Sequence, residues 1–211
     1  MPHPSAPSVT VLHGLRLKGF AEAATVAELW GQPLAEVQDH LEKAAADELA
    51  VHRDGRLTGW TLTPAGRAEN ERRLADELDR LGLRGHVRRA YDRFVALNGE
   101  MLATCTRWQV RDVDGEQVIN DHGDEAYDGA VIEALVDLDA RVQPVCVDLA
   151  EQLDRFGPYA PRFTVALDHV RQGGHQWFTK PVIESYHTVW FELHEDLLAS
   201  LGLDRASEGA R

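Results

Sequence analysis

Two histidines near the end of the chain, His187 and His194, lie seven residues apart in a segment of helical periodicity. At 100° per residue, both fall within about 40° of one line along the predicted helix. The other residues on that line are large and apolar: Ile183, Trp190, Leu197 and Leu201. An imidazole on such a stripe is either a neutral core residue with one hydrogen bond or part of a ligand pocket between helices. The sequence leaves both interpretations open.

The residues around this stripe define the predicted ligand-binding set. It consists of His187, Trp190, His194, Tyr186, Trp177 and Asn98. Because seven helical residues separate the two imidazoles by ~10.5 Å along the axis, we do not expect them to share a metal ion. If the protein is an enzyme, the expected acid–base groups are His187, His194 and Tyr186, with Asp121 or His122 as further candidates. No Ser-His-Asp pattern, Gly-rich phosphate loop or dinucleotide fingerprint occurs, so the sequence names no cofactor.

Other residues that could bind a metal or react as nucleophiles carry weaker patterns. His122 lies in Asn120-Asp121-His122-Gly123-Asp124, which matches neither an EF-hand nor a His-x-x-x-His helix, so we predict a solvated loop and no metal site. Cys105 and Cys146 make no Cys-x-x-Cys pair, which excludes a disulfide scaffold or a zinc ribbon. Both thiols fall on apolar positions and are expected to be buried and inert.

The N-terminal elements begin with three predicted helices. Residues 9–18 form the first, which ends at Gly19. The second covers 25–30, with Thr25 and Glu28 in a capping-box pattern. The third covers 33–49 and begins with Pro33 in its first turn. Its buried stripe is predicted to be Leu34, Val37, Leu41, Ala45 and Leu49.

A hairpin and a fourth helix follow. Asp54-Gly55 within 51–62 is a strong hairpin signal, and Thr63-Pro64 caps and opens a helix that runs to about Leu81. The order helix, helix, helix, hairpin, helix is the plan of a winged helix-turn-helix domain. In that plan the helix over 33–49 is the recognition helix, and the hairpin is the wing.

The stretch Trp60-Thr-Leu-Thr-Pro-Ala-Gly-Arg67 resembles the strand-to-helix junction of MarR- and PadR-like regulators, in which an LTxxGR pattern is common. Together with Leu15-Arg-Leu-Lys-Gly-Phe20, it also resembles a small actinobacterial winged-helix module that is sometimes attached to phosphoenolpyruvate-utilising enzymes. The resemblance covers about residues 9–82. It implies a transcriptional regulator that binds double-stranded DNA.

Charge opposes strong DNA binding. The expected DNA-binding residues are Arg53, Arg56, Gln38, Lys43, Arg16 and Lys18. The recognition helix, however, also presents Glu36, Asp39 and Glu42, which repel phosphates. We therefore expect weak binding, carried by the wing and the first helix more than by the recognition helix.

The remainder of the chain predicts a helical bundle. One apolar seam consists of Val87, Tyr91, Phe94, Asn98, Met101, Cys105 and Trp108, and a second of Val131, Leu135, Leu138, Val142, Val145 and Leu149. A polar loop over 111–124 separates them. Further helices are expected over 162–171 and from Pro181 to Leu201, with a break at Gly173-Gly174. The predicted fold is thus mainly α with a small β-hairpin: a winged helix-turn-helix domain over 1–82, then an all-α ligand-binding and dimerisation bundle over 83–211.

Composition bounds the function classes. The chain has 211 residues and a formal net charge of −13, from 22 basic and 35 acidic residues. Such acidity argues against a protein that coats nucleic acid or anionic membrane. No apolar run approaches the ~20 residues of a membrane span, and the N-terminus does not resemble a signal peptide. We expect a cytoplasmic, ligand-binding homodimer that regulates transcription. The alternatives are an enzyme with a His/Tyr/Trp-lined pocket, or a protein-interaction module that does not bind DNA.

Overall fold

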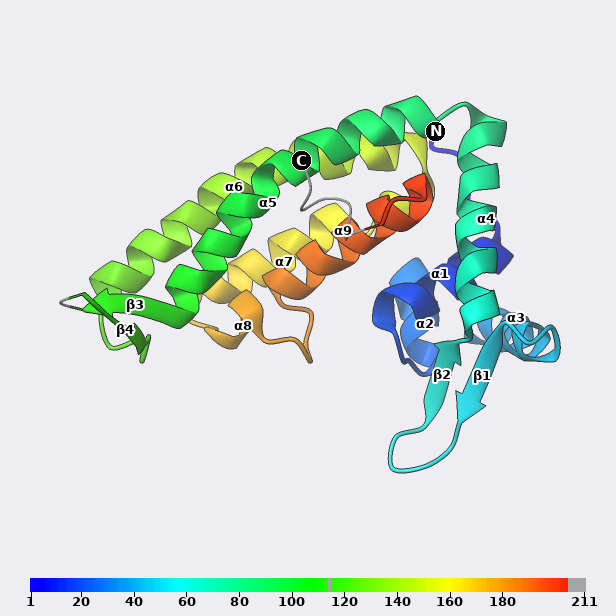
Figure 1. Cartoon of the computed structure of the whole chain (residues 1–211), viewed down its shortest axis with the longest axis horizontal. Helices are drawn as coiled ribbons and strands as arrows, with labels where there is room; N and C mark the ends of the chain where they lie inside the picture. Colours follow the sequence, from blue (N-terminus) through cyan, green and yellow to red (C-terminus); the bar gives the residue numbers. More distant parts are fainter. Residues whose placement is uncertain (114, 205–211) are drawn as a thin grey trace. The chain divides into compact units, whose positions relative to one another are not determined.

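A computed structural model describes residues 1–113 and 115–204 of the chain (Figure 1). The described residues are mainly helical, with two small antiparallel hairpins. They divide into two compact units. Of the described residues, unit 1 contains 1–88, 150–158 and 195–204, and unit 2 contains 89–113, 115–149 and 159–194. Within the described part of the chain, no helix is both long and apolar enough to cross a membrane.

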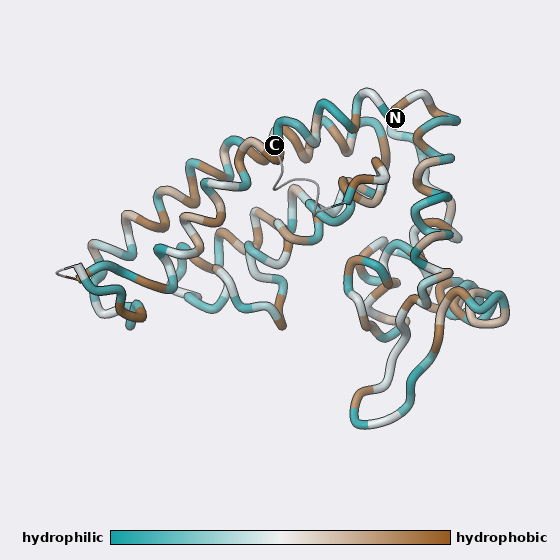
Figure 2. Tube along the Cα trace, in the orientation of Figure 1, coloured by the Kyte–Doolittle hydropathy of each residue, from teal (hydrophilic) through white to brown (hydrophobic). Residues whose placement is uncertain are grey.

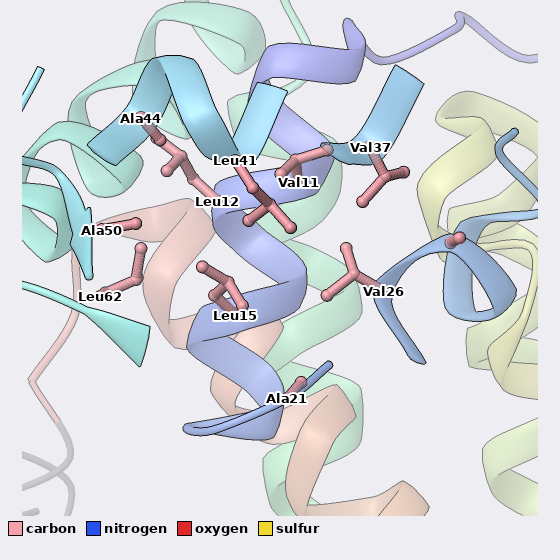
Figure 3. Packing of buried hydrophobic residues seen from close by; sticks show 11 residues of the cluster. Val11, Leu12, Leu15, Ala21, Val26, Val37, Leu41, Ala44, Ala50 and Leu62 are labelled. Carbon is pink, nitrogen blue, oxygen red and sulfur yellow. The ribbon is translucent and has the colours of Figure 1, made fainter. Parts of the chain in front are cut away.

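Unit 1 begins with three helices, a hairpin and a fourth helix. These are α1 (Pro7–Lys18), α2 (Ala23–Trp30), α3 (Leu34–Ala46), β1 (Ala50–Arg53), β2 (Gly59–Leu62) and α4 (Pro64–Leu81). The predicted hairpin is confirmed: β1 and β2 pair antiparallel, with Ala50 opposite Leu62 and Arg53 opposite Gly59. Buried side chains from α1, α2, α3 and the hairpin form its core, among them Leu12, Leu15, Val26, Val37 and Leu41 (Figure 3).

The junction between β2 and α4 depends on two residues, Thr63 and Gly66. The Thr63 hydroxyl accepts a hydrogen bond from the backbone N–H of Gly66 at 3.0 Å and donates one to the carbonyl of Glu48 at 2.8 Å. The predicted cap is therefore confirmed. A Cβ atom at Gly66 would lie 1.8 Å from the carbonyl oxygen of Leu49, so only glycine allows α4 to approach this closely.

Some local predictions in this unit were wrong. Helix α2 begins at Ala23 after Glu22, so Thr25 lies inside the helix and cannot cap it. Pro33 precedes α3, and that helix ends at Ala46, before Leu49. Ala44 is buried where Ala45 was expected, and Leu34 is 44% exposed. The stripe therefore ends early, because the chain leaves the helix through Glu48 at a positive φ of 59°.

Two later segments complete unit 1. They are the short helix η1 (Asp154–Phe156) and the part of α9 (Tyr186–Leu201) that follows His194. His3 forms a parallel bridge with Leu153, which joins the first residues of the chain to the first of these segments. The boundary predicted at residue 82 takes no account of such returning segments.

A buried ion network ties the returning segments to the first helices of unit 1. The fully buried Arg155 guanidinium pairs with Asp196, with Glu77 at 3.1 Å and with the Ser200 hydroxyl at 2.8 Å. His13 Nε2 lies 3.1 Å from the Asp196 carboxylate. Burial alone would raise the pKa of Asp196, but Arg155 and His13 hold that pKa well below its ordinary value.

Unit 2 is a bundle of helices with a hairpin inserted. Its elements lie within α5 (Arg84–Gln109), β3 (Val110–Val113), β4 (Glu116–Ile119), α6 (Glu125–Gln152), α7 (Tyr159–Arg171), α8 (Gln176–Thr179) and α9. Every residue of the two predicted seams that belongs to this unit is buried except Asn98, which is half-buried. Hydrophobic and hydrophilic residues alternate along these helices (Figure 2). Tyr186 of α9 bonds to Asp139 of α6, and Trp190 of α9 bonds to Asn98 of α5, so these helices pack on one another.

Three boundaries in this part of the chain differ from prediction. The polar loop expected over 111–124 contains the hairpin β3–β4, with Val110 opposite Ile119. All residues of β4 are exposed, and its sequence Glu-Gln-Val-Ile does not alternate between polar and apolar residues, so no strand pattern was visible there. Helix α7 begins at Tyr159 rather than at residue 162. Helix α9 begins at Tyr186 rather than at Pro181, because the Ser185 hydroxyl accepts a bond from the Thr188 N–H at 3.3 Å.

Candidate functional site

The two histidines of α9 differ in their surroundings. His194 is buried, and its ring lies 5.4 Å from the Phe94 ring and 6.5 Å from the Tyr91 ring. His187 is half-buried, and this burial lowers the pKa of its imidazole. The prediction that both histidines turn away from bulk solvent is therefore met at His194 and only in part at His187.

The polar groups of the predicted ligand-binding set are engaged within the bundle. Trp190 donates its indole N–H to the Asn98 side-chain oxygen at 3.1 Å, and Tyr186 donates its hydroxyl to Asp139 at 3.0 Å. Burial, and then the Asp139 carboxylate, raise the pKa of Tyr186 well above its ordinary value. Trp177 instead stacks on His169, with ring centroids 4.0 Å apart. Tyr186, Trp190 and Asn98 therefore use these polar groups to join helices of the bundle to one another.

The residues predicted to contact DNA fall into two groups. Arg53, Arg56, Gln38 and Lys43 are exposed, and Lys43 lies 3.4 Å from Asp47. Lys18 is half-buried.

Arg16 is placed differently from expectation. Its side chain is only 10% exposed and forms ion pairs with Glu71 at 2.7 Å and with Glu195 at 2.9 Å. The guanidinium serves to join α1, α4 and α9 within unit 1, which corrects its assignment to DNA contact. The acidic residues expected on the outward face of α3 are exposed as predicted: Glu36, Asp39 and Glu42.

A cluster that sequence reasoning missed lies in unit 2. His122 from the segment before α6, Asp128 from the first turn of α6 and His175 from the residue before α8 each offer a ligand atom, and these atoms lie within 4.8 Å of one another. His122 Nδ1 is 2.8 Å from Asp128 Oδ2, and the rings of His122 and His175 have centroids 4.7 Å apart. Asp128 is buried, whereas His175 is exposed. The cluster therefore opens to solvent on the side of His175.

Asn120 holds the buried part of this cluster in place. Its side-chain N–H donates to Asp128 Oδ1 at 2.7 Å and to the carbonyl of Trp108 at 3.1 Å, and its oxygen accepts the His122 backbone N–H at 3.2 Å. These bonds support a positive φ of 60° at His122, a backbone conformation that a residue with a Cβ atom rarely adopts.

Aromatic rings border the same cluster. The Trp108 ring lies 4.4 Å from the His122 ring and 5.4 Å, edge-on, from the His175 ring. The Phe178 ring also stacks on Trp108, with ring centroids 4.5 Å apart. The three polar residues thus meet beside an apolar wall, where electrostatic interactions are stronger than in bulk water.

Sequence spacing offered only a weak signal for this cluster. His122 was assigned to a solvated loop, and His175 stands far from it in sequence, after Gly173-Gly174. The two cysteines, by contrast, match expectation: both are buried, and burial raises the pKa of each thiol to about 12.

Comparisons of the chain with protein-family models, with curated proteins and with solved structures found no match.

Proposed function

We propose that this chain is a DNA-binding transcriptional regulator, in which unit 1 is a winged helix-turn-helix domain that contacts the duplex. The observation that carries the proposal is the pairing of Ala21 with Trp60. Ala21 lies between α1 and α2, and it exchanges two backbone hydrogen bonds with Trp60 of β2 at 3.0 and 2.7 Å. It thereby adds a third, one-residue strand to the hairpin.

The connection between α2 and α3 supports the same proposal. Helix α2 ends at Trp30, Gly31 caps it in the left-handed conformation, and α3 begins at Leu34. A short turn that contains glycine is characteristic of helix-turn-helix motifs. In such motifs the second helix enters the major groove, and Gln38 and Lys43 are exposed on that helix here.

The wing supplies the favourable charge. Arg53 and Arg56 are exposed in the hairpin, whereas Glu36, Asp39 and Glu42 are exposed on α3. A phosphate near α3 meets like charge, and a phosphate near the hairpin meets guanidinium groups. We therefore infer that the wing provides most of the affinity and that α3 adds little.

Effector binding and homodimerisation by unit 2 remain predictions from the sequence. The proposal for DNA does not depend on them. It also gives no catalytic role to His187, His194 or Tyr186.

The test measures DNA affinity by fluorescence anisotropy at low and at physiological salt. The probes are a labelled duplex from upstream of the protein's own coding region and an unrelated duplex of equal length. We expect salt-dependent binding, with higher affinity for the upstream duplex than for the unrelated one. The double substitution Arg53→Ala, Arg56→Ala should weaken binding at least tenfold and reduce the log–log salt slope by about 2, if each arginine neutralises one phosphate.

Arg80→Ala is the matched control, because Arg80 is an exposed arginine in the last turn of α4 in the same unit. It should leave affinity unchanged. Absence of binding to any duplex at low salt would overturn the proposal and favour a protein-interaction module. A loss in the Arg80 variant of about half that in the double wing variant, in units of log affinity, would show that only net charge matters.

A further inference from the structure

We propose that His122, Asp128 and His175 form a binding site for a divalent first-row transition-metal ion, of which Zn²⁺ is the probe of choice. One donor atom from each residue lies within 4.8 Å of the other two. Two imidazole nitrogens with one carboxylate oxygen are a donor set suited to zinc, iron, cobalt or nickel. Mg²⁺ and Ca²⁺ prefer ligand sets made only of oxygen atoms, so the two histidines argue against them.

The distances require only a small adjustment. Bonds of ~2.0–2.1 Å to a tetrahedral ion place two ligand atoms roughly 3.4 Å apart. His122 Nδ1 and Asp128 Oδ2, at 2.8 Å, would separate slightly as the ion takes the place between them. His175 must move closer, and it is the exposed member of the set, next to the four-residue helix α8. The least constrained ligand is thus the one that has to move.

The supporting contacts are those expected around a metal ligand. Asn120 donates to Asp128 Oδ1 at 2.7 Å, which leaves Oδ2 directed toward His122. Asn120 is itself buried and anchored to the Trp108 carbonyl at 3.1 Å. Hydrogen bonds of this kind orient ligating carboxylates, and their removal commonly weakens metal binding about 10–100-fold.

The local charge also favours a cation. Asp121 and Glu125 are exposed beside the cluster in sequence, and Asp124 accepts an ion pair from Arg111 at 3.1 Å. These three carboxylates thus outnumber the guanidinium of Arg111, which pairs with Asp124. Because three protein ligands leave at least one coordination position open, a bound ion would retain a water molecule or accept a further ligand from the side of His175.

The experiment uses the full chain without an affinity tag. Zn²⁺ is titrated by calorimetry and in competition with a chromophoric chelator, and Co²⁺ is added separately to record its visible absorption. We expect one tight equivalent of Zn²⁺ and a Co²⁺ spectrum of nitrogen and oxygen ligation. His175→Ala and His122→Ala should each lower the affinity at least tenfold, and Asn120→Ala about tenfold.

His169→Ala is the matched control, because His169 is an exposed histidine of unit 2 outside the cluster. It should bind Zn²⁺ like the unmodified chain. Because His175 is exposed, the His175→Ala variant should fold normally, and its circular dichroism spectrum should match that of the unmodified chain. The proposal is overturned if the unmodified chain takes up no tight equivalent, or if the His175 variant retains full affinity. Neither outcome depends on DNA binding.

Discussion

Arg155 of η1 and Asp196 of α9 form an ion pair in which both side chains are completely buried. Glu77 and Ser200 bond to the same guanidinium, and His13 approaches the same carboxylate. Removal of Asp196 takes one of two counter-ions from the buried Arg155 guanidinium, which then keeps Glu77 alone of these two carboxylates. Such a loss is far more costly than the loss of an exposed ion pair.

We therefore expect Asp196→Asn to lower the free energy of unfolding by about 3–5 kcal/mol. Arg72→Ala is the control, because Arg72 of α4 is exposed and pairs with Glu69 and Asp76; its cost should stay below about 1 kcal/mol. Urea unfolding monitored by circular dichroism measures both values. Similar values for the two variants would contradict this account of the network.

The same carboxylate predicts a dependence of stability on pH. The folded-state pKa of Asp196 is depressed, because Arg155 and His13 outweigh the effect of burial. Below the unfolded value of about 3.9, the unfolded chain binds a proton that the folded chain does not. The contribution is thus complete above pH ~4 and decreases as the pH falls toward the folded pKa. The stability of the unmodified chain should therefore fall more steeply below pH 4 than that of Asp196→Asn, in unfolding curves recorded at several pH values.

Gly66 and Gly99 provide a matched pair of glycine substitutions. A Cβ atom at Gly66 would overlap the Leu49 carbonyl at 1.8 Å, whereas one at Gly99 on α5 meets nothing within 4 Å. Gly66→Ala should cost about 3 kcal/mol or more, because backbone atoms must shift. Gly99→Ala should stabilise by about 0.5–1 kcal/mol, as alanine does inside a helix. Thermal melts of both variants test the contrast, and a stable Gly66 variant would refute the close approach of α4.

The two thiols should resist alkylation in the folded protein. Burial raises the pKa of Cys105 and Cys146 to about 12, so almost no thiolate exists at pH 8, and the sulfur atoms are also shielded. Iodoacetamide at pH 8 should label neither cysteine in the native protein and both in urea. Mass spectrometry reads the outcome, and rapid native labelling of either residue would contradict its placement in the core.

Local patterns in the sequence predicted the elements that short-range contacts determine. The hairpin signal at Asp54-Gly55, the Thr63 cap and the apolar seams all act within a few residues. The structure contains the hairpin, closed by a loop over 54–58 rather than by a two-residue turn, together with the cap and the seams. The capping box at Thr25 failed because the helix starts earlier, which the sequence pattern could not distinguish.

Features that depend on distant partners were not predictable in this way. His13, Arg155 and Asp196 meet only after the chain has left unit 1 and returned. His122 and His175 likewise belong to separate segments, and neither shows a metal-binding spacing by itself. Conversely, the histidine stripe of α9 was placed correctly at His194, but its neighbours proved to bond to Asn98 and Asp139.

The late return of α9 to unit 1 also bears on how the protein is made. During translation, α1 to α4 are synthesised first, and Asp196 is added only after all the residues of unit 2. Until then Arg155 lacks its main counter-ion, and limited proteolysis of stalled nascent chains should find unit 1 still susceptible. A chain interrupted before Glu195 would leave the same defect permanently. Completion of α9 is thus the step in synthesis at which the buried ion network of unit 1 can first form.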